Sequence, residues 1–166
     1  MHDRHIRAII LPKKSKRTTI KIILKMNIKF KKLSASAVMP RKAHASDAGF
    51  DMTSVEEVTI EPNSRYAINT GIAVEIPLGY YGMVLGRSGN TMRKGLVGQT
   101  GIIDTGYYDA IKVMAFNTTE TPIKINVGDR VGQLIIVPHL ECAFEEGDFT
   151  ANNRGGGFGH SGGNVL

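Results

Sequence analysis

Short apolar runs, most of them with a period of two, recur along the chain from Met26 to Pro138 and are separated by turn-forming residues. A period of two is typical of a strand with one buried face. We predict strands at residues 28–31, 58–60, 66–68, 72–76, 82–86, 111–116, 123–125 and 130–137. Helical spacing is never kept over three turns, and only residues 88–94 could form a short helix. The pattern predicts an all-β fold, a jelly-roll-like barrel or sandwich with at most one short helix.

Charge divides the chain into unequal parts. Residues 1–25 hold eight Lys or Arg and one acid, whereas the rest of the 166 residues holds 13 basic and 14 acidic side chains. The body is therefore not a basic surface of the kind that binds nucleic acid. We predict a basic extension at residues 1–25 that is disordered or non-native, a β-barrel domain at 26–149, and a flexible glycine-rich lid at 150–166. An arm that contacts nucleic acid is the alternative interpretation of the extension.

The single cysteine, Cys142, excludes an intramolecular disulfide and fits a reducing compartment. It also argues against a cysteine-based zinc site. No apolar run is long enough to span a bilayer, and the runs at residues 8–11 and 20–24 are too short for a signal peptide. We therefore expect a soluble protein of the cytoplasm.

The stretch at residues 98–111 combines one carboxylate, Asp104, with glycines on both sides, Gly101 and Gly106. Such glycines favour a tight hairpin or bulge whose backbone comes close to a ligand. The predicted core strand at residues 111–116 follows, so the carboxylate would be fixed at the foot of a strand. Two interpretations are open: an aspartate that caps its own turn by local hydrogen bonds, or an acid with a chemical task.

Three further clusters carry polar groups suited to phosphate chemistry. Residues 47–51 supply two carboxylates. Residues 86–89 lead from a strand into the possible helix, where serine can cap and free N–H groups can bind phosphate. Residues 128–134 place an amide, Gln133, within an apolar strand. Each has a structural alternative, since Asp51 could pair with Arg87 and Gln133 could be a hydrogen-bonded core amide.

The fifth cluster is the glycine-rich tail, in which six of the nine residues 155–163 are glycine. Residues 157–162 match G-x-G-x-x-G, but no helix can follow in the residues that remain, so a dinucleotide site is excluded. Such a tail has no fixed conformation alone and can become ordered over a ligand. A plain linker has no need of Arg154 and Phe158. Together the five clusters provide carboxylates for a hard cation, phosphate donors and an aromatic lid, as polyphosphate chemistry requires.

In this order and with nearly this spacing, the five clusters resemble those of the trimeric dUTP pyrophosphatases (dUTPases), over residues 26–161. The resemblance implies a homotrimer of jelly-roll subunits that hydrolyses dUTP to dUMP and pyrophosphate with Mg²⁺. Asp104 would be the general base that orients a water for in-line attack at the α-phosphorus. Tyr107 would pack under the deoxyribose. Backbone groups of residues 98–103 would recognise uracil, and the substrate-binding positions there would be Gly98, Gly101 and Ile103.

The resemblance also implies a phosphate and metal site. Asp51 would act near Mg²⁺ through a bound water, because this ion takes most of its direct ligands from substrate phosphates. Gln133 would contact the α-phosphate or the metal waters. The remaining substrate contacts would come from Arg87, Ser88, Gly89, Arg154, Phe158, Gly159 and Ser161. Ser88 would stabilise the leaving group, Arg154 would meet the γ-phosphate, and Phe158 would stack on uracil as the tail closes over a neighbouring subunit's site.

Three positions depart from the family pattern. The tail has one residue fewer than usual between Arg154 and Phe158, so the γ-phosphate contact requires a shifted register or another basic group. Asp109 stands where glycine is usual, and Asn90 replaces an apolar residue after the Arg-Ser pair. Aspartate tolerates a left-handed backbone better than most residues, so we expect little damage at Asp109.

Three other functions fit parts of the sequence. A dCTP deaminase relative would share the fold and the phosphate clusters, but the glutamate of its central hairpin has no counterpart between Gly98 and Ile111. A dUTPase-like regulatory binding module, such as a phage protein that contacts a repressor, would need the site but not turnover. A nucleic-acid binder would act through residues 1–25.

Overall fold

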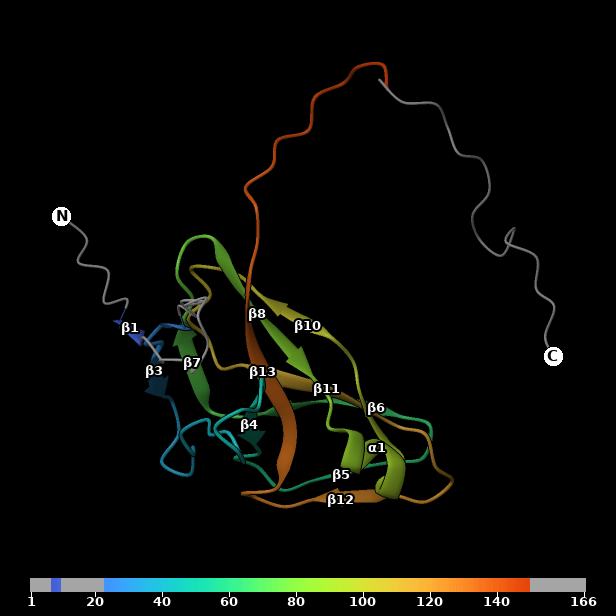
Figure 1. Ribbon diagram of the computed structural model, residues 1–166. Coiled ribbons are helices and arrows are strands. Elements are labelled where there is room, and N and C mark those ends of the chain that lie inside the picture. Colours follow the sequence, from blue (N-terminus) through green and yellow to red (C-terminus); the bar gives the residue numbers. More distant parts are fainter. Residues whose placement is uncertain (1–6, 10–22, 150–166) are drawn as a thin grey trace, which may run out of the picture.

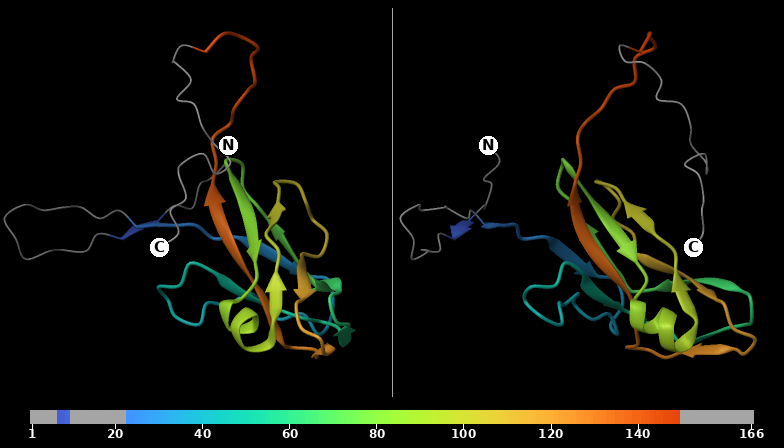
Figure 2. Two further views of the ribbon diagram at one scale, coloured as in Figure 1. Left: turned by 90° about the vertical axis from the view of Figure 1, so that its right-hand side faces the viewer. Right: turned by 45° about the vertical axis from the view of Figure 1, so that its right-hand side comes forward.

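Two antiparallel sheets form the body of the protein, and their facing sides enclose the core (Figures 1 and 2). The computed structural model describes residues 7–9 and 23–149. The larger sheet has the strand order β10-β8-β13-β4, and the smaller sheet has the order β6-β11-β9. The ladders β12-β5 and β3-β7 complete the body, and β1 pairs with β2.

The elements agree with the all-β prediction, since this described part of the chain contains strands and one short helix. The elements are β1 (Arg7–Ile9), β2 (Ile23–Lys25), β3 (Lys29–Lys32), β4 (Phe50–Thr53), β5 (Val58–Ile60), β6 (Arg65–Asn69), β7 (Ile72–Glu75), β8 (Tyr80–Leu85), α1 (Ser88–Lys94), β9 (Leu96–Gly98), β10 (Gly101–Ile103), β11 (Lys112–Asn117), β12 (Ile123–Ile125) and β13 (Arg130–Pro138). The bounds of α1, β5 and β12 are those predicted from the sequence. Within the described residues, no helix is both long enough and apolar enough to cross a membrane.

The core follows from the alternation of buried and exposed side chains along the strands. In β11, Val113 and Ala115 are buried, whereas Met114 and Phe116 face outward. The core residues of the larger sheet include Met52, Val84 and Leu134. Each fully buried aliphatic side chain of this kind stabilises the fold by about 1.5–3 kcal/mol.

The stretch at residues 98–111 contains a tight turn at residues 104–107, with Gly106 at a φ of 90°, but its strands do not pair with each other as a hairpin. β9 pairs with β11, whereas β10 pairs with β8, so the chain passes from one sheet to the other between Gly98 and Gly101. At this crossing Gly98 lies against Gly86, and a Cβ on Gly86 would be 2.6 Å from the Gly98 nitrogen. Both residues are therefore glycine because two backbones touch there. The crossing leads the chain into β10 and on to Asp104.

Strand β3 also differs from the expected alternation, because all four of its side chains, including Phe30, are exposed. Its partner in the described part of the chain is β7 alone, so β3 is an edge strand. The division of the chain into extension, barrel and lid stays a prediction.

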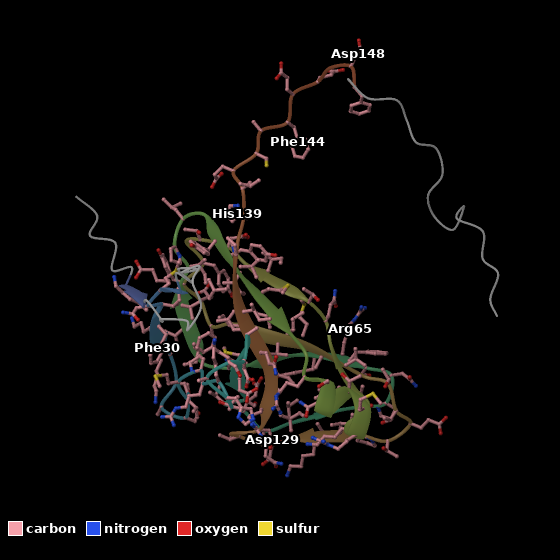
Figure 3. The ribbon with its side chains drawn as sticks, viewed as in Figure 1. Phe30, Arg65, Asp129, His139, Phe144 and Asp148 are labelled. Atoms are coloured by element: carbon pink, nitrogen blue, oxygen red, sulfur yellow. The ribbon has the colours of Figure 1, made fainter. Side chains whose placement is uncertain are left out.

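The segment after β13, residues 139–149, leaves the body as an arm (Figures 1 and 3). Its apolar side chains Leu140, Phe144 and Phe149 are almost fully exposed. Figure 3 shows His139 at the base of this arm, with Phe144 and Asp148 farther from the body. Apolar side chains displayed in this way are typical of an interaction surface.

Candidate active site

Asp104 stands directly after β10, at the first position of a tight turn. The Tyr107 N–H donates to the Asp104 carbonyl at 3.2 Å. Gly106, at the third position of the turn, has a φ of 90°, a backbone angle that turns of this type require there and that glycine adopts without strain. The Thr105 hydroxyl donates to the Pro77 carbonyl at 3.3 Å and holds the turn against the loop before β8. The exposed Asp104 carboxylate makes no hydrogen bond or ion pair with any described residue. It therefore does not cap its own turn.

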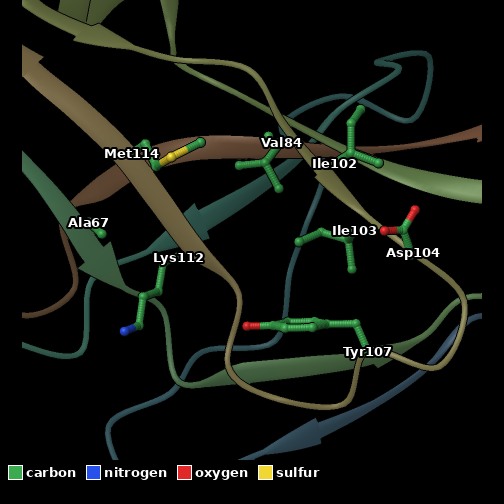
Figure 4. A pocket seen from close by; sticks show the side chains of 9 residues that line it. Ala67, Val84, Ile102, Ile103, Asp104, Tyr107, Lys112 and Met114 are labelled. Carbon is green, nitrogen blue, oxygen red and sulfur yellow. The ribbon is translucent and has the colours of Figure 1, made fainter.

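Asp104 and Tyr107 line a pocket of about 330 Å³ between β10 and the smaller sheet (Figure 4). In Figure 4 the Tyr107 ring lies beneath Ile103, and its hydroxyl points toward Lys112. The hydroxyl donates to the Ala110 carbonyl at 3.3 Å, which fixes the ring. The other lining residues are Ala67, Val84, Gly101, Ile102, Ile103, Lys112 and Met114. An apolar pocket with a flat ring on one side and a carboxylate at its rim suits a base and a sugar.

Asp51, on β4, is the centre of a second group. Its Oδ1 accepts a hydrogen bond from Arg87 Nε at 2.9 Å, and its Oδ2 accepts one from Arg130 Nη1 at 3.2 Å. The Asp51 side chain is 13% exposed and that of Arg87 is 20% exposed. A carboxylate so far removed from water needs charged partners. The pair with Arg87 was one of the alternatives considered from the sequence, whereas the pair with Arg130 was not foreseen.

Gln133 is the cross-strand neighbour of Asp51 and of Leu85. Its side chain packs against Gly49, where a Cβ would lie 2.7 Å from Gln133 Oε1. The amide is half-buried and makes no hydrogen bond to the residues that the structure describes, so it is not a paired core amide. Gln133, Asp51 and Arg87 line a pocket of about 380 Å³ on the larger sheet. Polar atoms without partners and an arginine suit a phosphate group.

Ser88 and Gly89 form the start of α1 beside this second group. The N-cap residue is Arg87, which makes no side-chain cap, so the predicted capping by Ser88 is wrong. Ser88 is instead the first helical residue, and its hydroxyl is exposed. The Arg93 guanidinium covers Gly89, where a Cβ would lie 2.7 Å from Arg93 Nη2. Neither Ser88 nor Gly89 lines one of the two pockets, although both directly follow Arg87.

The two groups do not meet within one chain, since their pockets share no lining residue. Asp104 follows Ile103, which faces Gly82, whereas Gln133 faces Leu85 and lies two strands away from β10. At about 3.3 Å per residue and about 4.8 Å between strands, Asp104 and Gln133 are roughly 16 Å apart. A carboxylate at this distance cannot activate a water beside a phosphate that Gln133 holds.

The predicted tail residues Arg154, Phe158, Gly159 and Ser161 lie outside the described residues. Within the described part, Arg130 stands in the same cluster as Gln133, but no role is predicted for it from the sequence. Arg130 and Asp51 are 79 positions apart, and only the β13–β4 ladder brings them together. A single sequence carries no signal for a pair of residues so far apart along the chain.

Acidic side chains in the described part of the chain do not gather into a metal cage. No group of three or more His, Cys, Asp or Glu residues that could hold an ion is present there. Asp51 and Asp104 line separate pockets. A hard cation at this site would therefore take most of its oxygen ligands from elsewhere.

Relatives with assigned activities cover most of the chain. A family model described as dUTPase matches residues 35–162. The deoxyuridine 5'-triphosphate nucleotidohydrolase of Thermobifida fusca is 40% identical over 146 residues, which cover 85% of this chain and 82% of that protein. The corresponding protein of Mycobacterium marinum is 42% identical over 144 residues, which cover 81% of this chain and 94% of that protein.

Solved structures of phage dUTPases share the fold. The dUTPase of Staphylococcus bacteriophage 80alpha with dUpNHpp has a TM-score of 0.78 and 31% identity, covering 82% of this chain and 98% of that chain. A variant dUTPase from phage phi11 of S. aureus, described for its structural Mg(II) ion, has a TM-score of 0.72 and 30% identity, covering 75% and 99% of the two chains. The jelly-roll prediction is confirmed, and the chain belongs to the dUTPase family.

Proposed function

We propose that this protein hydrolyses dUTP to dUMP and pyrophosphate by in-line attack of water at the α-phosphorus. Its family membership supports this activity. The observation that carries the assignment to particular residues is the exposed Asp104 carboxylate, without a partner among the described residues, at the rim of the Tyr107 pocket. The reaction limits uracil in DNA and supplies dUMP for thymidylate synthesis.

Asp104 is the general base in this mechanism, since its carboxylate is free to accept a proton from the attacking water. Tyr107 lies under the deoxyribose and leaves no room for a 2′-hydroxyl. β10 supplies the contacts to uracil: it is an edge strand whose partner in the described sheet is β8 alone, so its outer N–H and C=O groups remain for a ligand. Gly101 and Ile103 line the pocket, whereas Gly98 acts through its contact with Gly86.

The second pocket binds the phosphates. Arg87 and Gln133 face the α-phosphate and its neighbours, and Ser88 stabilises the leaving group. Each Asp51 oxygen accepts one hydrogen bond from an arginine, which leaves lone pairs for a metal-bound water. This fits Mg²⁺ held mainly by substrate oxygens, which agrees with the lack of a three-residue metal cage in the described part of the chain. When bound, Mg²⁺ neutralises the phosphate charge.

A complete site requires two copies of the chain, because Asp104 and Gln133 are too far apart in one. We assign the Asp104 pocket of one subunit and the Asp51 pocket of its neighbour to the same dUTP molecule, in a homotrimer. The exposed apolar side chains of the arm, such as Phe144, support its docking on another copy. The described arm, residues 139–149, extends away from its own subunit. In keeping with the family resemblance, we assign Arg154 and Phe158 to the closure of a neighbour's site.

Mixing two inactive variants tests the shared site. Asp104→Asn and Gln133→Ala each remove one half of the site, and neither alone should turn over dUTP. Coexpressed in equal amounts, they form trimers in which about a quarter of the sites combine two intact halves. Recovery of up to about a quarter of the wild-type rate supports the arrangement. Lack of recovery in trimers shown to be mixed would place both halves in one subunit.

Substrate choice tests the reaction itself. Pyrophosphate release is measured with Mg²⁺ from dUTP, dCTP, dTTP and UTP in parallel. Turnover of dUTP alone fits the proposal, whereas ammonia release from dCTP would identify a deaminase. Binding of dUTP without turnover would leave a regulatory binding module. The proposed compartment is the cytoplasm, which localisation of a tagged full-length chain would check.

A further inference from the structure

Helix α1 is attached to the body through one buried side chain, Asn90, which is 9% exposed. A helix of seven residues is not stable alone, so its attachment decides where its first turn lies. An apolar residue, which the family resemblance predicts here, would attach the helix by packing that tolerates small displacements. A buried amide is different, because it must find a hydrogen-bond partner and the bond is directional.

The partner of Asn90 is the backbone of β13. Asn90 Nδ2 donates to the Arg130 carbonyl at 2.9 Å. Arg130 lies at an irregularity of the β13–β4 ladder, where it faces Thr53 while Gly132 faces Met52. A bulge of this kind re-aims the side chain of a strand residue. The amide therefore fixes the backbone at the position from which the Arg130 side chain leaves.

A closed ring of four hydrogen bonds results. The Asn90 N–H donates to the Arg87 carbonyl at 2.9 Å, which links the helix to the residue before it. Arg87 and Arg130 then hold the two oxygens of Asp51, at 2.9 Å and 3.2 Å. The ring joins α1, β13 and β4, so no member can shift without stretching another bond. Asn90 is the only member without a formal charge.

We propose that Asn90 is a positioning residue for the phosphate pocket: by tying the first turn of α1 to the bulge of β13, it sets the spacing of Arg87 and Arg130 around Asp51. This inference rests on the proposed function of that pocket. When a triphosphate draws the Arg87 side chain, Arg130 keeps its hold on Asp51 and the two backbones stay in place. The residue touches no substrate and acts through its neighbours.

Asn90→Leu tests this role, since leucine keeps the branched shape of the side chain and removes the donor. We expect the KM for dUTP to rise about tenfold, because the misplaced arginines should lose binding free energy equal to about one hydrogen bond. By calorimetry, binding of inorganic tripolyphosphate weakens about tenfold, whereas inhibition by deoxyuridine, which occupies the Asp104 pocket, does not change. The matched control is Thr91→Val in the same helix, which removes a hydrogen bond to the Leu96 carbonyl and leaves the ring intact.

A double-mutant cycle with Arg130→Gln shows whether Asn90 acts through Arg130. In the Arg130→Gln background, Asn90→Leu should weaken tripolyphosphate binding by less than about twofold. Equal losses in both backgrounds would overturn the proposal, as would equal weakening of tripolyphosphate and deoxyuridine or a lower Tm with unchanged affinities. A wild-type protein that binds no tripolyphosphate would overturn it as well. If the wild type binds tripolyphosphate as described but turns over no dUTP, the proposed function fails and the role of Asn90 stands.

Discussion

The two pockets differ in how each holds its aspartate before any substrate arrives. The Asp104 carboxylate is exposed and has no partner among the described residues, and it is carried by a turn after an edge strand. The Asp51 carboxylate is 13% exposed and has an arginine on each oxygen, inside a ladder of the larger sheet. A general base must be free to take a proton, whereas a group that orients phosphates and waters must not move. The contrast therefore supports the proposal that proton transfer occurs in one pocket and positioning in the other.

The two pockets also differ in their lining. Around Asp104 most of the lining is apolar, with Lys112 as the one basic residue, and suits an uncharged base and sugar. Around Asp51 the lining includes Arg87 and Gln133, whose polar atoms suit a charged ligand. The same substitution, aspartate to asparagine, should therefore have different consequences in the two pockets.

The largest effect is expected for Asp104→Asn. Loss of the base should lower kcat by about 10³-fold, while dUTP binding and the Tm stay close to wild type, because the carboxylate pairs with no described residue. Steady-state kinetics and thermal unfolding measure both quantities. Asp109→Asn is the matched control, since it removes the same charge at an exposed position outside both pockets. Near-normal turnover of the Asp104 variant would remove this residue from the mechanism.

The next largest effect is expected at the crossing between the two sheets, where Gly98 contacts Gly86. In Gly98→Ala, the new Cβ would collide with the Gly86 backbone at the crossing between the sheets. Backbone cannot swing aside as a side chain can, so we expect a loss of about 2–3 kcal/mol in unfolding free energy. Denaturant unfolding measures it. Gly101→Ala is the control, because its Cβ would meet Met114 at an ordinary 3.4 Å. Equal stability of the two variants would contradict a rigid crossing.

A moderate effect is expected for Asp51→Asn. It leaves two guanidinium groups facing each other without their carboxylate, and Arg87 is too buried for water to compensate fully. We expect a loss of about 1–2 kcal/mol in unfolding free energy, together with a higher KM for dUTP. A variant with wild-type stability and a reduced kcat alone would show that the Asp51 pairs are incidental and would weaken the contrast with Asp104.

The sequence predicted the parts of this arrangement that depend on local pattern. The period of two gave most strands, such as those at residues 58–60 and 123–125, and α1 begins and ends where expected. These succeed because strand alternation and helix ends are set by near neighbours. The five clusters were visible for the same reason, since each is a short stretch of polar residues and glycines.

Parts that depend on distant contacts could not be predicted. Residues 86–89 and 98–111 are close in sequence, but β10 runs antiparallel beside β8, so Asp104 lies at the end of β8 opposite to residues 86–89 and their functional groups belong to different pockets. The tight turn predicted from Gly101 and Gly106 is present at residues 104–107, but β10 pairs with β8 and not with β11, so no hairpin forms. Arg130 escaped notice because its partner Asp51 is brought near only by the ladder between β13 and β4.

The smallest effect concerns Thr53, which faces Arg130 on β4, two residues beyond Asp51. Its hydroxyl is buried and has no hydrogen-bond partner in the described part of the chain. Valine has nearly the same shape and no hydroxyl to desolvate, so Thr53→Val should raise the unfolding free energy by about 0.5–1 kcal/mol and leave dUTP kinetics unchanged. Such a result would show that ion pairs and the bulge, not every polar group nearby, fix the Asp51 pocket. A less stable variant would mean that the hydroxyl is hydrogen-bonded to water, and that the base of this pocket is more hydrated than its ion pairs suggest.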